Sequence, residues 1–590
     1  MVVDIFFYTK MDIRVDIKKT LDGAVRTLGF SEVVFSLEHP ADITHGDYAT
    51  NVALVVSKQV RTHASSEKLN PKDTALLIKK ELEKVSLPYV EKIEIAGPGF
   101  INFYLTRSFF ASSIQEILKQ KSSFGHNTLY KGKKVLVEYT DPNPFKQFHI
   151  GHLMSNAIGE SISRLFAVSG ARVKRACYQG DFGLHVAKAL WAILKHKDVF
   201  PSKKTPLSER TAFLGACYVE GAEAYDNDPQ AKTEIEVLNK KIFEKKDKEI
   251  RTFYDAGKKW SLEHFEELYA LLGTQFDYYF FESEVARDGI ELVQRFMEKG
   301  VFEKSDNAIV FKAERFDSKL HTRVFINSQG LPTYETKELG LNTKKYKKIR
   351  PDKSIIITAN EQSDYFRVVL KALEIVAPEA RKITEHISHG MLRFAQGKMS
   401  SRKGNVITGE SMINDIRDLV LEKMKDREMD EKEKKEVSDI VAVAAIKYSI
   451  LKQLTSSDII FDFEKSISFE GDSGPYLLYT AVRAQSVLEK AKKEGIKARI
   501  QTSLDETVLL EKKLCQFPEI VSRSSEERSP HFVATYLIEL AALFNSWYAH
   551  HPIVVAGSVE SPHRVAITSA VHVVLENGLD VLGIRIPKKM

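Results

Sequence analysis

The sequence predicts an α/β protein in which a parallel sheet lies between a small α+β domain and a helical bundle. Two apolar, strand-like runs, residues 135–139 and 172–178, each lead through a polar loop into a helical period, which is the βαβ pattern of a parallel sheet. Before them, residues 92–105 alternate between apolar and polar side chains as a strand does. After residue 404 the helical period continues almost without interruption.

The composition is that of a folded protein with a mildly basic charge. The 590 residues include 43% hydrophobic and 28% charged side chains, which excludes a disordered chain, and the length predicts three to four domains. The net charge of +6 identifies no partner by itself. Three scattered cysteines, Cys177, Cys217 and Cys515, form neither a disulfide framework nor a four-cysteine zinc site, which favours a reducing compartment.

Neither a targeting segment nor a membrane span is predicted. The apolar run at residues 2–8 is interrupted by Asp4 and is shorter than the core of a signal peptide. An uninterrupted apolar run of about 18 residues, long enough for a bilayer, is also lacking. We therefore expect a cytoplasmic protein with no membrane partner.

The first domain is expected to span residues 1–122. An amphipathic stretch at 13–28 and a helical pattern at 49–59 precede the alternating strand, which a Gly-Pro-Gly turn at 97–99 breaks in two. A connector rich in Lys, Ser and Gly then runs from residue 119 to 134 and marks the boundary.

The second domain is expected to span residues 123–407 and the third, helical domain residues 408–590. Residues from about 195 to 330 predict a long insertion, after which the sheet resumes at 354–358. Because ligands bind at the carboxyl ends of parallel strands, the loop at 141–152 is predicted to bind one.

A His-x-Gly-His motif, His149 to His152, lies at the junction of that loop and the following helix. With 17 His and 30 Gly in the chain, such a motif would arise by chance roughly 0.03 times. A helix N-terminus attracts phosphate, Gly151 lets a nucleotide approach the backbone, and two imidazoles can donate to an α-phosphate. The competing interpretation is that both histidines only cap the helix.

A second motif, residues 397–404 (Gly-Lys-Met-Ser-Ser-Arg-Lys-Gly), is cationic and flanked by glycines. A mobile loop of this kind can bring ammonium groups to a triphosphate and withdraw them afterwards. Alone, such a loop is more often solvated surface.

In this order and about 250 residues apart, the two motifs resemble the paired signatures of class I aminoacyl-tRNA synthetases. The segment Val137-Glu138-Tyr139-Thr140-Asp141-Pro142-Asn143, continued through His152, resembles the arginyl form. Further matches occur at residues 46–51, 97–102, 180–183, 474–477, 544–548 and 578–584. The resemblance therefore covers nearly the whole chain.

This resemblance implies a Rossmann-type, nucleotide-binding catalytic domain between an N-terminal tRNA-binding domain and a helical anticodon-binding domain. It implies an arginine–tRNA ligase, which activates L-arginine with ATP to arginyl-adenylate and transfers it to the 3′ end of tRNA(Arg) in translation. Mg²⁺ would arrive on the ATP phosphates, with no protein-bound structural metal. We expect a monomer in which tRNA binds before the adenylate forms.

The resemblance also assigns residues to each role. Catalytic residues would be His149, His152, Lys398, Lys146 and Lys403. ATP would contact Gly151, His149, His152, Lys398, Met399 and Ser400. Arginine would contact Glu138, Asn143, Tyr334, Glu338 and Gln362. A guanidinium is planar and carries five donors, so a carboxylate with paired acceptors suits it, and Glu338 lies one helical turn after Tyr334.

Contacts to tRNA are expected from aromatic and basic segments in all three domains. Candidates are Tyr548, Asn545, Lys344, Lys345, Asn51 and Phe100. Tyr548 is preferred over Phe544 and Trp547, which we expect in the bundle core, because RNA loops are bound by exposed aromatic rings. The basic run at 344–350 would contact acceptor-stem phosphates.

Three positions depart from the family pattern. Glu338 stands where the family usually has Asp, so its longer carboxylate must retract or the pocket must be wider. Tyr365 replaces a histidine expected three residues after Gln362. Ser401 replaces the second lysine of the cationic motif, and either Lys146, three residues before the first histidine, or Lys403 would compensate.

Two alternatives stay open. Another class I synthetase, of the cysteinyl or glutamyl type, would share the nucleotide motifs, although the scattered cysteines disfavour the zinc-dependent cysteinyl form. An inactive tRNA-binding paralogue is disfavoured by the intact His149, Gly151, His152 and Lys398, because a binding protein has no use for α-phosphate donors.

Overall fold

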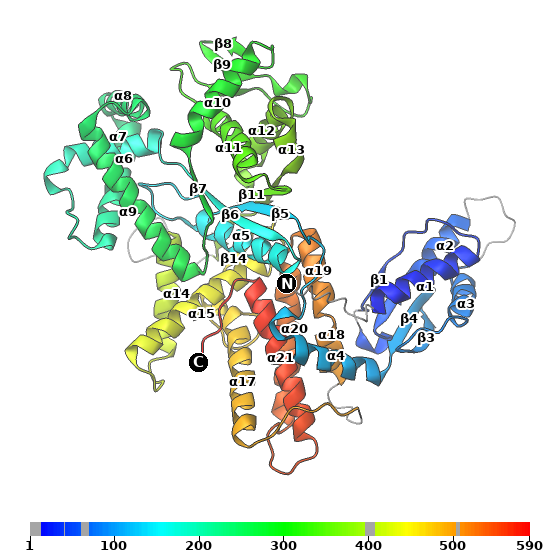
Figure 1. Cartoon of the computed structure of the whole chain (residues 1–590). Helices are drawn as coiled ribbons and strands as arrows, with labels where there is room; N and C mark the ends of the chain where they lie inside the picture. The colour runs from blue at the N-terminus through cyan, green and yellow to red at the C-terminus, as the bar shows by residue number, and fades with distance from the viewer. Residues whose placement is uncertain (1–12, 41, 61–69, 396–407, 503–507) are drawn as a thin grey trace, which may run out of the picture. The chain divides into compact units, whose positions relative to one another are not determined.

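The computed structural model describes residues 13–40, 42–60, 70–395, 408–502 and 508–590. The chain forms two compact units, the first made of residues 1–124, 484–516 and 543–574, and the second of residues 125–483, 517–542 and 575–590. The predicted α/β class with its parallel sheet, N-terminal α+β part and helical C-terminal region is confirmed (Figure 1). Within the described ranges, no helix is long and apolar enough to cross a membrane.

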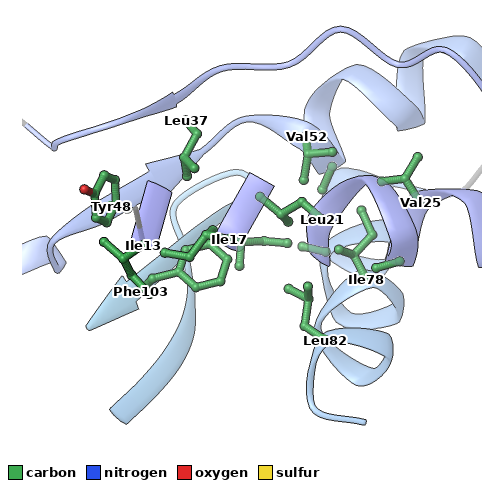
Figure 2. Packing of buried hydrophobic residues seen from close by; sticks show 14 of the residues in the cluster. Ile13, Ile17, Leu21, Val25, Leu37, Tyr48, Val52, Ile78, Leu82 and Phe103 are labelled. Carbon is green, nitrogen blue, oxygen red and sulfur yellow. The ribbon is translucent and has the colours of Figure 1, made fainter. Parts of the chain in front are cut away.

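The first unit contains an antiparallel sheet in the order β1-β2-β4-β3. Its strands are β1 (Leu37–Glu38), β2 (Tyr48–Thr50), β3 (Val90–Ala96) and β4 (Phe100–Leu105). Its N-terminal helices are η1 (Ile43–His45), α1 (Ile13–Thr27), α2 (Val52–Val60), α3 (Pro71–Leu82), α4 (Arg107–Gln120) and η2 (Lys121–Ser123). The apolar face of α1, which carries the fully buried Ile17 and Leu21, packs with Ile78 and Phe103, as Figure 2 shows.

The second unit is built on a parallel sheet in the order β12-β11-β5-β6-β7. Its strands are β5 (Lys134–Glu138), β6 (Arg172–Gln179), β7 (Tyr278–Phe281), β11 (Lys353–Ala359) and β12 (Thr384–His389). The strands predicted at 135–139, 172–178 and 354–358 are therefore present. β5 is central, and Val135, Leu136 and Val137 are fully buried.

The expectation that the sheet resumes only after residue 330 is wrong. β7 pairs with the end of β6, through Cys177 and Tyr279, and adds a strand within the segment predicted to be an insertion. Its four residues, Tyr-Tyr-Phe-Phe, do not alternate between apolar and polar side chains. Periodicity therefore could not detect this short strand at the sheet edge.

Helices cover this sheet, and the unit also contains a second group of helices and a small antiparallel sheet (Figure 1). Those beside the strands are α5 (Ile150–Val168), α10 (Glu282–Met297), α11 (Tyr334–Ile349), α12 (Ser363–Val376) and α13 (Pro378–Ile383). A group packed on α6 comprises α6 (Leu184–Lys195), η3 (Lys197–Val199), α7 (Leu207–Asn227), α8 (Pro229–Glu244) and α9 (Lys248–Leu272). A small antiparallel sheet consists of β10 (Arg323–Ile326), β9 (Ala308–Phe311) and β8 (Glu303–Ser305), with η4 (Ala313–Arg315) and η5 (Asn360–Gln362) nearby in the chain.

The region after residue 407 is almost entirely helical, as predicted. Its helices are α14 (Gly409–Lys423), α15 (Glu431–Leu451), α16 (Phe463–Ser466), α17 (Gly474–Lys493), α18 (Val508–Cys515), α19 (Phe517–Glu527), α20 (His531–His550) and α21 (Ser561–Val581). The exception is β14 (Ile459–Phe461), which pairs in parallel with β13 (Leu392–Phe394). Three residues are too few to give a strand pattern.

A buried ionic network joins α5 to the sheet. The Glu160 carboxylate accepts hydrogen bonds from Tyr139 Oη at 2.6 Å, Arg164 Nε at 2.7 Å and Arg175 Nε at 3.1 Å. Close by, Lys447 is fully buried, and its ammonium group donates to two backbone oxygens. Burial of these charges is tolerated because each is paired or hydrogen-bonded.

Candidate functional site

The loop between β5 and α5 lies at the carboxyl ends of the parallel strands. Three of its residues, Thr140, Asp141 and Phe145, have φ angles of 79°, 49° and 68°, in the left-handed region that costs free energy for residues other than glycine. Hydrogen bonds hold this backbone: the Thr140 N–H donates to Ser155 Oγ, and the Phe145 N–H to Ser261 Oγ, both at 3.0 Å. The loop is therefore rigidly shaped where a ligand is expected.

The two histidines of the motif lie together at the start of α5. His149 is the N-cap residue, and its backbone N–H donates to Nδ1 of His152 at 3.2 Å. Their rings stack with centroids 3.4 Å apart. Because Nδ1 of His152 accepts a hydrogen bond, the ring proton of the neutral imidazole lies on Nε2. Burial and the charges of His149 and Lys146 lower the pKa of His152 well below its ordinary value, so the ring is neutral.

Capping and phosphate contact are therefore compatible roles for these histidines. A Cβ atom at Gly151 would lie 3.0 Å from Cε1 of His149, so only glycine lets that ring lie over the first turn without a tight contact. The helix cap uses Nδ1 of His152, and Nε2 of the same ring remains a donor for a phosphate oxygen.

The chain that follows the cationic motif returns to the histidine motif. Thr408 forms an isolated bridge with His149, and the Gly409 N–H donates to the Phe148 carbonyl at 2.8 Å. The motif itself, with Lys398, Met399, Ser400 and Lys403, lies outside the described residues.

Four acidic residues gather beside this loop: Glu138 at the end of β5, Asp141, Glu282 at the start of α10 and Glu338 on α11. Glu138, Glu282 and Glu338 are 1%, 4% and 6% exposed. Lysines neutralise two of them. Lys345 Nζ lies 3.0 Å from Glu138 Oε2, and Lys337 Nζ lies 2.5 Å from Glu282 Oε2.

Glu338 forms no ion pair with any described residue. Its Oε2 accepts one hydrogen bond, from Asn342 Nδ2 at 3.2 Å. Burial and the charge of Glu138 raise the pKa of Glu338, and Lys345 and Lys337 oppose that rise. Burial and Glu138 likewise raise the pKa of Asp141. The site thus holds an excess of buried acid, which a cationic ligand would neutralise.

Asn143 lies against the Gly180 turn beside this acid cluster. A Cβ atom at Gly180 would lie 2.3 Å from Asn143 Oδ1 and 3.4 Å from the carboxyl carbon of Glu282. The structure therefore places Glu138, Asn143 and Glu338 around one site.

The other two predicted arginine contacts are more exposed. Tyr334 begins α11 with 61% of its surface exposed, and the Lys337 ammonium lies 4.3 Å from the centre of its ring. Gln362 is exposed at the end of η5.

The expectation that Lys345 contacts tRNA is wrong. Lys345 is 1% exposed, and its ammonium group is paired with Glu138. A run of basic residues on a helix necessarily turns some of them inward, and Lys345 follows Glu338 by seven residues, which is two turns on the same face. Lys344 stays partly exposed, 3.5 Å from a carboxylate oxygen of Glu284.

Sequence reasoning also missed three polar residues of the site. Tyr178 Oη, both amide atoms of Gln179 and Asn342 Oδ1 are buried without a hydrogen-bond partner among the described residues. Buried polar atoms are normally paired, so such atoms are expected to meet a ligand or water. The available signal was position: Tyr178 and Gln179 end a parallel strand.

Comparison with known proteins agrees with this geometry. The model of the class I (R) tRNA synthetase catalytic domain matches residues 113–463, that of the arginyl-tRNA synthetase N-terminal domain residues 11–105, and that of the DALR anticodon-binding domain residues 477–590. The chain belongs to the arginyl-tRNA synthetases of class I. The predicted family is therefore confirmed.

Relatives match this arginyl-tRNA synthetase over most of its length. The chain is 30% identical to an arginine–tRNA ligase of Treponema denticola, over 88% of this chain and 90% of that one. It is 28% identical to that of Halothermothrix orenii, over 98% and 100%. The arginyl-tRNA synthetase structures of Thermus thermophilus (TM-score 0.80, 23% identity, 98% of this chain and 100% of that one) and Plasmodium falciparum (0.76, 18%, 98% and 99%) share its fold.

The structure shows the surroundings of two residues that are linked to the departures from the family pattern. Tyr365 lies in the first turn of α12, where burial and the charge of Glu338 raise its pKa. The Lys146 ammonium lies 5.1 Å from the centre of the Tyr218 ring on α7, within cation–π range.

The remaining tRNA candidates of the synthetase lie in the first unit. Phe544 and Trp547 are 0% and 7% exposed, whereas Tyr548 and Asn545 are partly exposed. Phe100 is 38% exposed at the start of β4. Asn51 Oδ1 accepts a hydrogen bond from the Ser36 N–H at 2.9 Å, and the side chain thus shapes its own loop.

Proposed function

We propose that this synthetase activates L-arginine with ATP and transfers the arginyl group to the 3′ end of tRNA(Arg). One observation carries the amino-acid specificity: Glu338 is a buried carboxylate without a cationic partner among the described residues, next to two carboxylates that have one. A guanidinium supplies the missing charge and donors suited to paired carboxylate oxygens. Glu138, Asn143, Tyr334 and Gln362 would complete the arginine contacts.

In the first step, an oxygen of the arginine carboxylate attacks the α-phosphorus of ATP. A new phosphorus–oxygen bond forms, the bond to the β-phosphate breaks, and pyrophosphate leaves. The N–H groups at the start of α5 and the neutral His152, through Nε2, would stabilise the charge on the phosphate oxygens, together with His149. Gly151 would let the nucleotide approach the backbone.

Lysines from two segments of the chain would complete the ATP site. Lys146 extends from the β5–α5 loop. Lys398 and Lys403 precede Thr408 by ten and five residues, and since Thr408 is bonded to His149, five residues span at most about 18 Å back to that histidine. Met399 and Ser400 belong to the same segment.

Mg²⁺ would come with the substrate and not from a protein site. The ion would be carried by the ATP phosphates, where it would offset their negative charge.

In the second step, the terminal ribose hydroxyl of tRNA attacks the arginyl carbonyl and AMP leaves. We propose that residues 1–122 hold the outer corner of tRNA, residues 408–590 hold its anticodon loop, and residues 123–407 form the catalytic domain. Contacts would come from Phe100, Asn51, Asn545, Tyr548 and Lys344. The enzyme would act as a cytoplasmic monomer.

A charging assay tests this function. Purified full-length protein is incubated with ATP, total tRNA and each labelled amino acid in turn. Charging with arginine alone supports the proposal. Charging with cysteine or glutamate would instead support another class I activity, and tRNA binding without any charging would identify an inactive paralogue.

Pyrophosphate exchange measured with and without tRNA tests the order of events. Exchange should require tRNA. Exchange of equal rate in its absence would contradict the proposed order.

A further inference from the structure

Lys345 is buried in the acidic site and contacts one of its carboxylates. Its Nζ lies 3.0 Å from Glu138 Oε2, and both side chains are 1% exposed. Such a pair loses hydration at both ends, so it adds little to stability compared with apolar residues of the same size. A contribution to stability therefore does not explain why this ion pair is buried at a binding site.

Glu138 occupies a position where its geometry matters. It ends β5, the central strand, two residues before the left-handed residue Thr140 and the loop that carries Asn143. α11, which carries Lys345, also presents Glu338 two turns earlier on the same face. One helix thus supplies both the uncompensated carboxylate and the cation that fixes its neighbour.

We propose that Lys345 is a positioning residue for the amino-acid substrate, holding the Glu138 carboxylate oriented so that Glu138 and Glu338 together accept the cationic groups of arginine. Lys345 itself touches no substrate. This inference rests on the proposed function, since it assumes that arginine binds here.

The charges around the pair explain why one lysine is needed. The charge of Glu138 acts on Asp141 in its own loop, on Glu338 on α11, and on Cys177 and Tyr178 on β6. Glu282 on α10 and Lys337 on α11 act in turn on Glu338. Lys345 lowers the pKa of both Asp141 and Glu338, whereas Glu138 raises them. Without Lys345, the clustered acids would take up protons at higher pH and lose their attraction for a guanidinium.

The test replaces Lys345 with Met, which keeps its length without charge, and with Arg, which restores the charge. Arginine affinity of the full-length protein is measured by titration calorimetry between pH 6.5 and 9, and KM values for arginine, ATP and tRNA are measured in charging. Lys345→Met is expected to weaken arginine binding about tenfold or more, most strongly at low pH, with KM for tRNA unchanged. Lys345→Arg should recover most of the affinity.

Lys382→Met is the control because this lysine is exposed and forms its ion pair with Glu379, which is not one of the clustered acids. It should leave arginine affinity unchanged at every pH. A Lys345→Met variant that binds arginine as the wild type does, or that loses tRNA affinity instead, would overturn the inference.

A melting curve and a second variant distinguish a folding defect from a loss of arginine binding. Thermal melting checks folding, and if Lys345→Met does not fold, Lys345→Gln keeps a donor to Glu138 without its charge and should show the same loss. A wild type that fails to bind arginine contradicts the proposed function itself, whereas normal wild-type binding with an unaltered variant contradicts only the role of Lys345.

Discussion

At the scale of single residues, substitutions of His152 can distinguish a capping role from a catalytic role. Its Nδ1 accepts the His149 N–H, and its Nε2 carries the proton. His152→Ala removes both functions and should lower the rate of adenylate formation by about 10², the effect of losing one transition-state donor. His152→Asn keeps an acceptor for the cap but changes the donor, so it should be nearly as slow.

Single-turnover formation of arginyl-adenylate in the presence of tRNA measures this rate. Recovery to wild-type rate in His152→Asn would mean that the ring only caps α5.

Asn342 explains how the site accommodates a glutamate where the family usually has aspartate. Its Nδ2 donates to the Glu338 backbone oxygen at 2.9 Å and to Oε2 at 3.2 Å, which draws the longer side chain back along α11. Asn342→Ala should therefore raise KM for arginine several-fold. In a Glu338→Asp background the shorter carboxylate no longer reaches Asn342, so the same change should have little further effect.

A double-mutant cycle on KM for arginine, with kcat and KM for ATP followed in parallel, measures this coupling. Strictly additive effects would show that Asn342 and Glu338 act independently.

At the scale of elements, the strand–loop–helix order could be read from the sequence, but the shape of the loop could not. Apolar runs and the helical period locate β5, β6 and α5 because burial imposes them on the residue pattern. The positive φ angles of Thr140 and Asp141 carry no such mark, since they are maintained by distant partners such as Ser155. The acids Glu138 and Glu338 were predicted only through the family resemblance.

The loop's fit against the turn after β6 gives a prediction at this scale. Gly180→Ala places a Cβ atom 2.3 Å from Asn143 Oδ1, so Asn143 must move. KM for arginine should rise about tenfold with only a small change in melting temperature, because the displaced atom ends a flexible side chain. Gly23→Ala, in α1 with no atom within 4 Å of the new Cβ, is the control and should leave KM unchanged.

Steady-state charging and thermal melting of both variants test this. An unchanged KM in Gly180→Ala would remove Asn143 from the arginine site.

At the scale of the whole molecule, sequence reasoning failed where distant segments decide the environment of a residue. β7 was missed because only its pairing with β6 defines it, and Lys345 was placed on the surface because its partner Glu138 lies 207 residues away. Lys447 belongs to the same class. It lies on α15, yet its ammonium donates to the Leu272 and Gly583 oxygens, both at 2.7 Å, and so joins three remote parts of the second unit.

This junction should make stability depend on pH. Burial lowers the pKa of Lys447 from 10.5 to about 8, while Glu160 and Asp580 raise it and Arg164 lowers it. Between those two pH values the unfolded chain holds a proton on Lys447 that the folded protein lacks, so the free energy of unfolding rises with pH there, by about 3 kcal/mol from this group. Below pH 8 both states are protonated, and this contribution is absent.

Lys447→Met removes the titrating group together with its two hydrogen bonds. The variant should melt at a lower temperature than the wild type, and the difference should widen from pH 8 to 10 as the wild type alone gains stability. Melting curves at half-unit pH steps measure this difference, in which the other titrating groups cancel. Curves that stay parallel across this range would show that Lys447 keeps an ordinary pKa and that the junction is held by its hydrogen bonds alone.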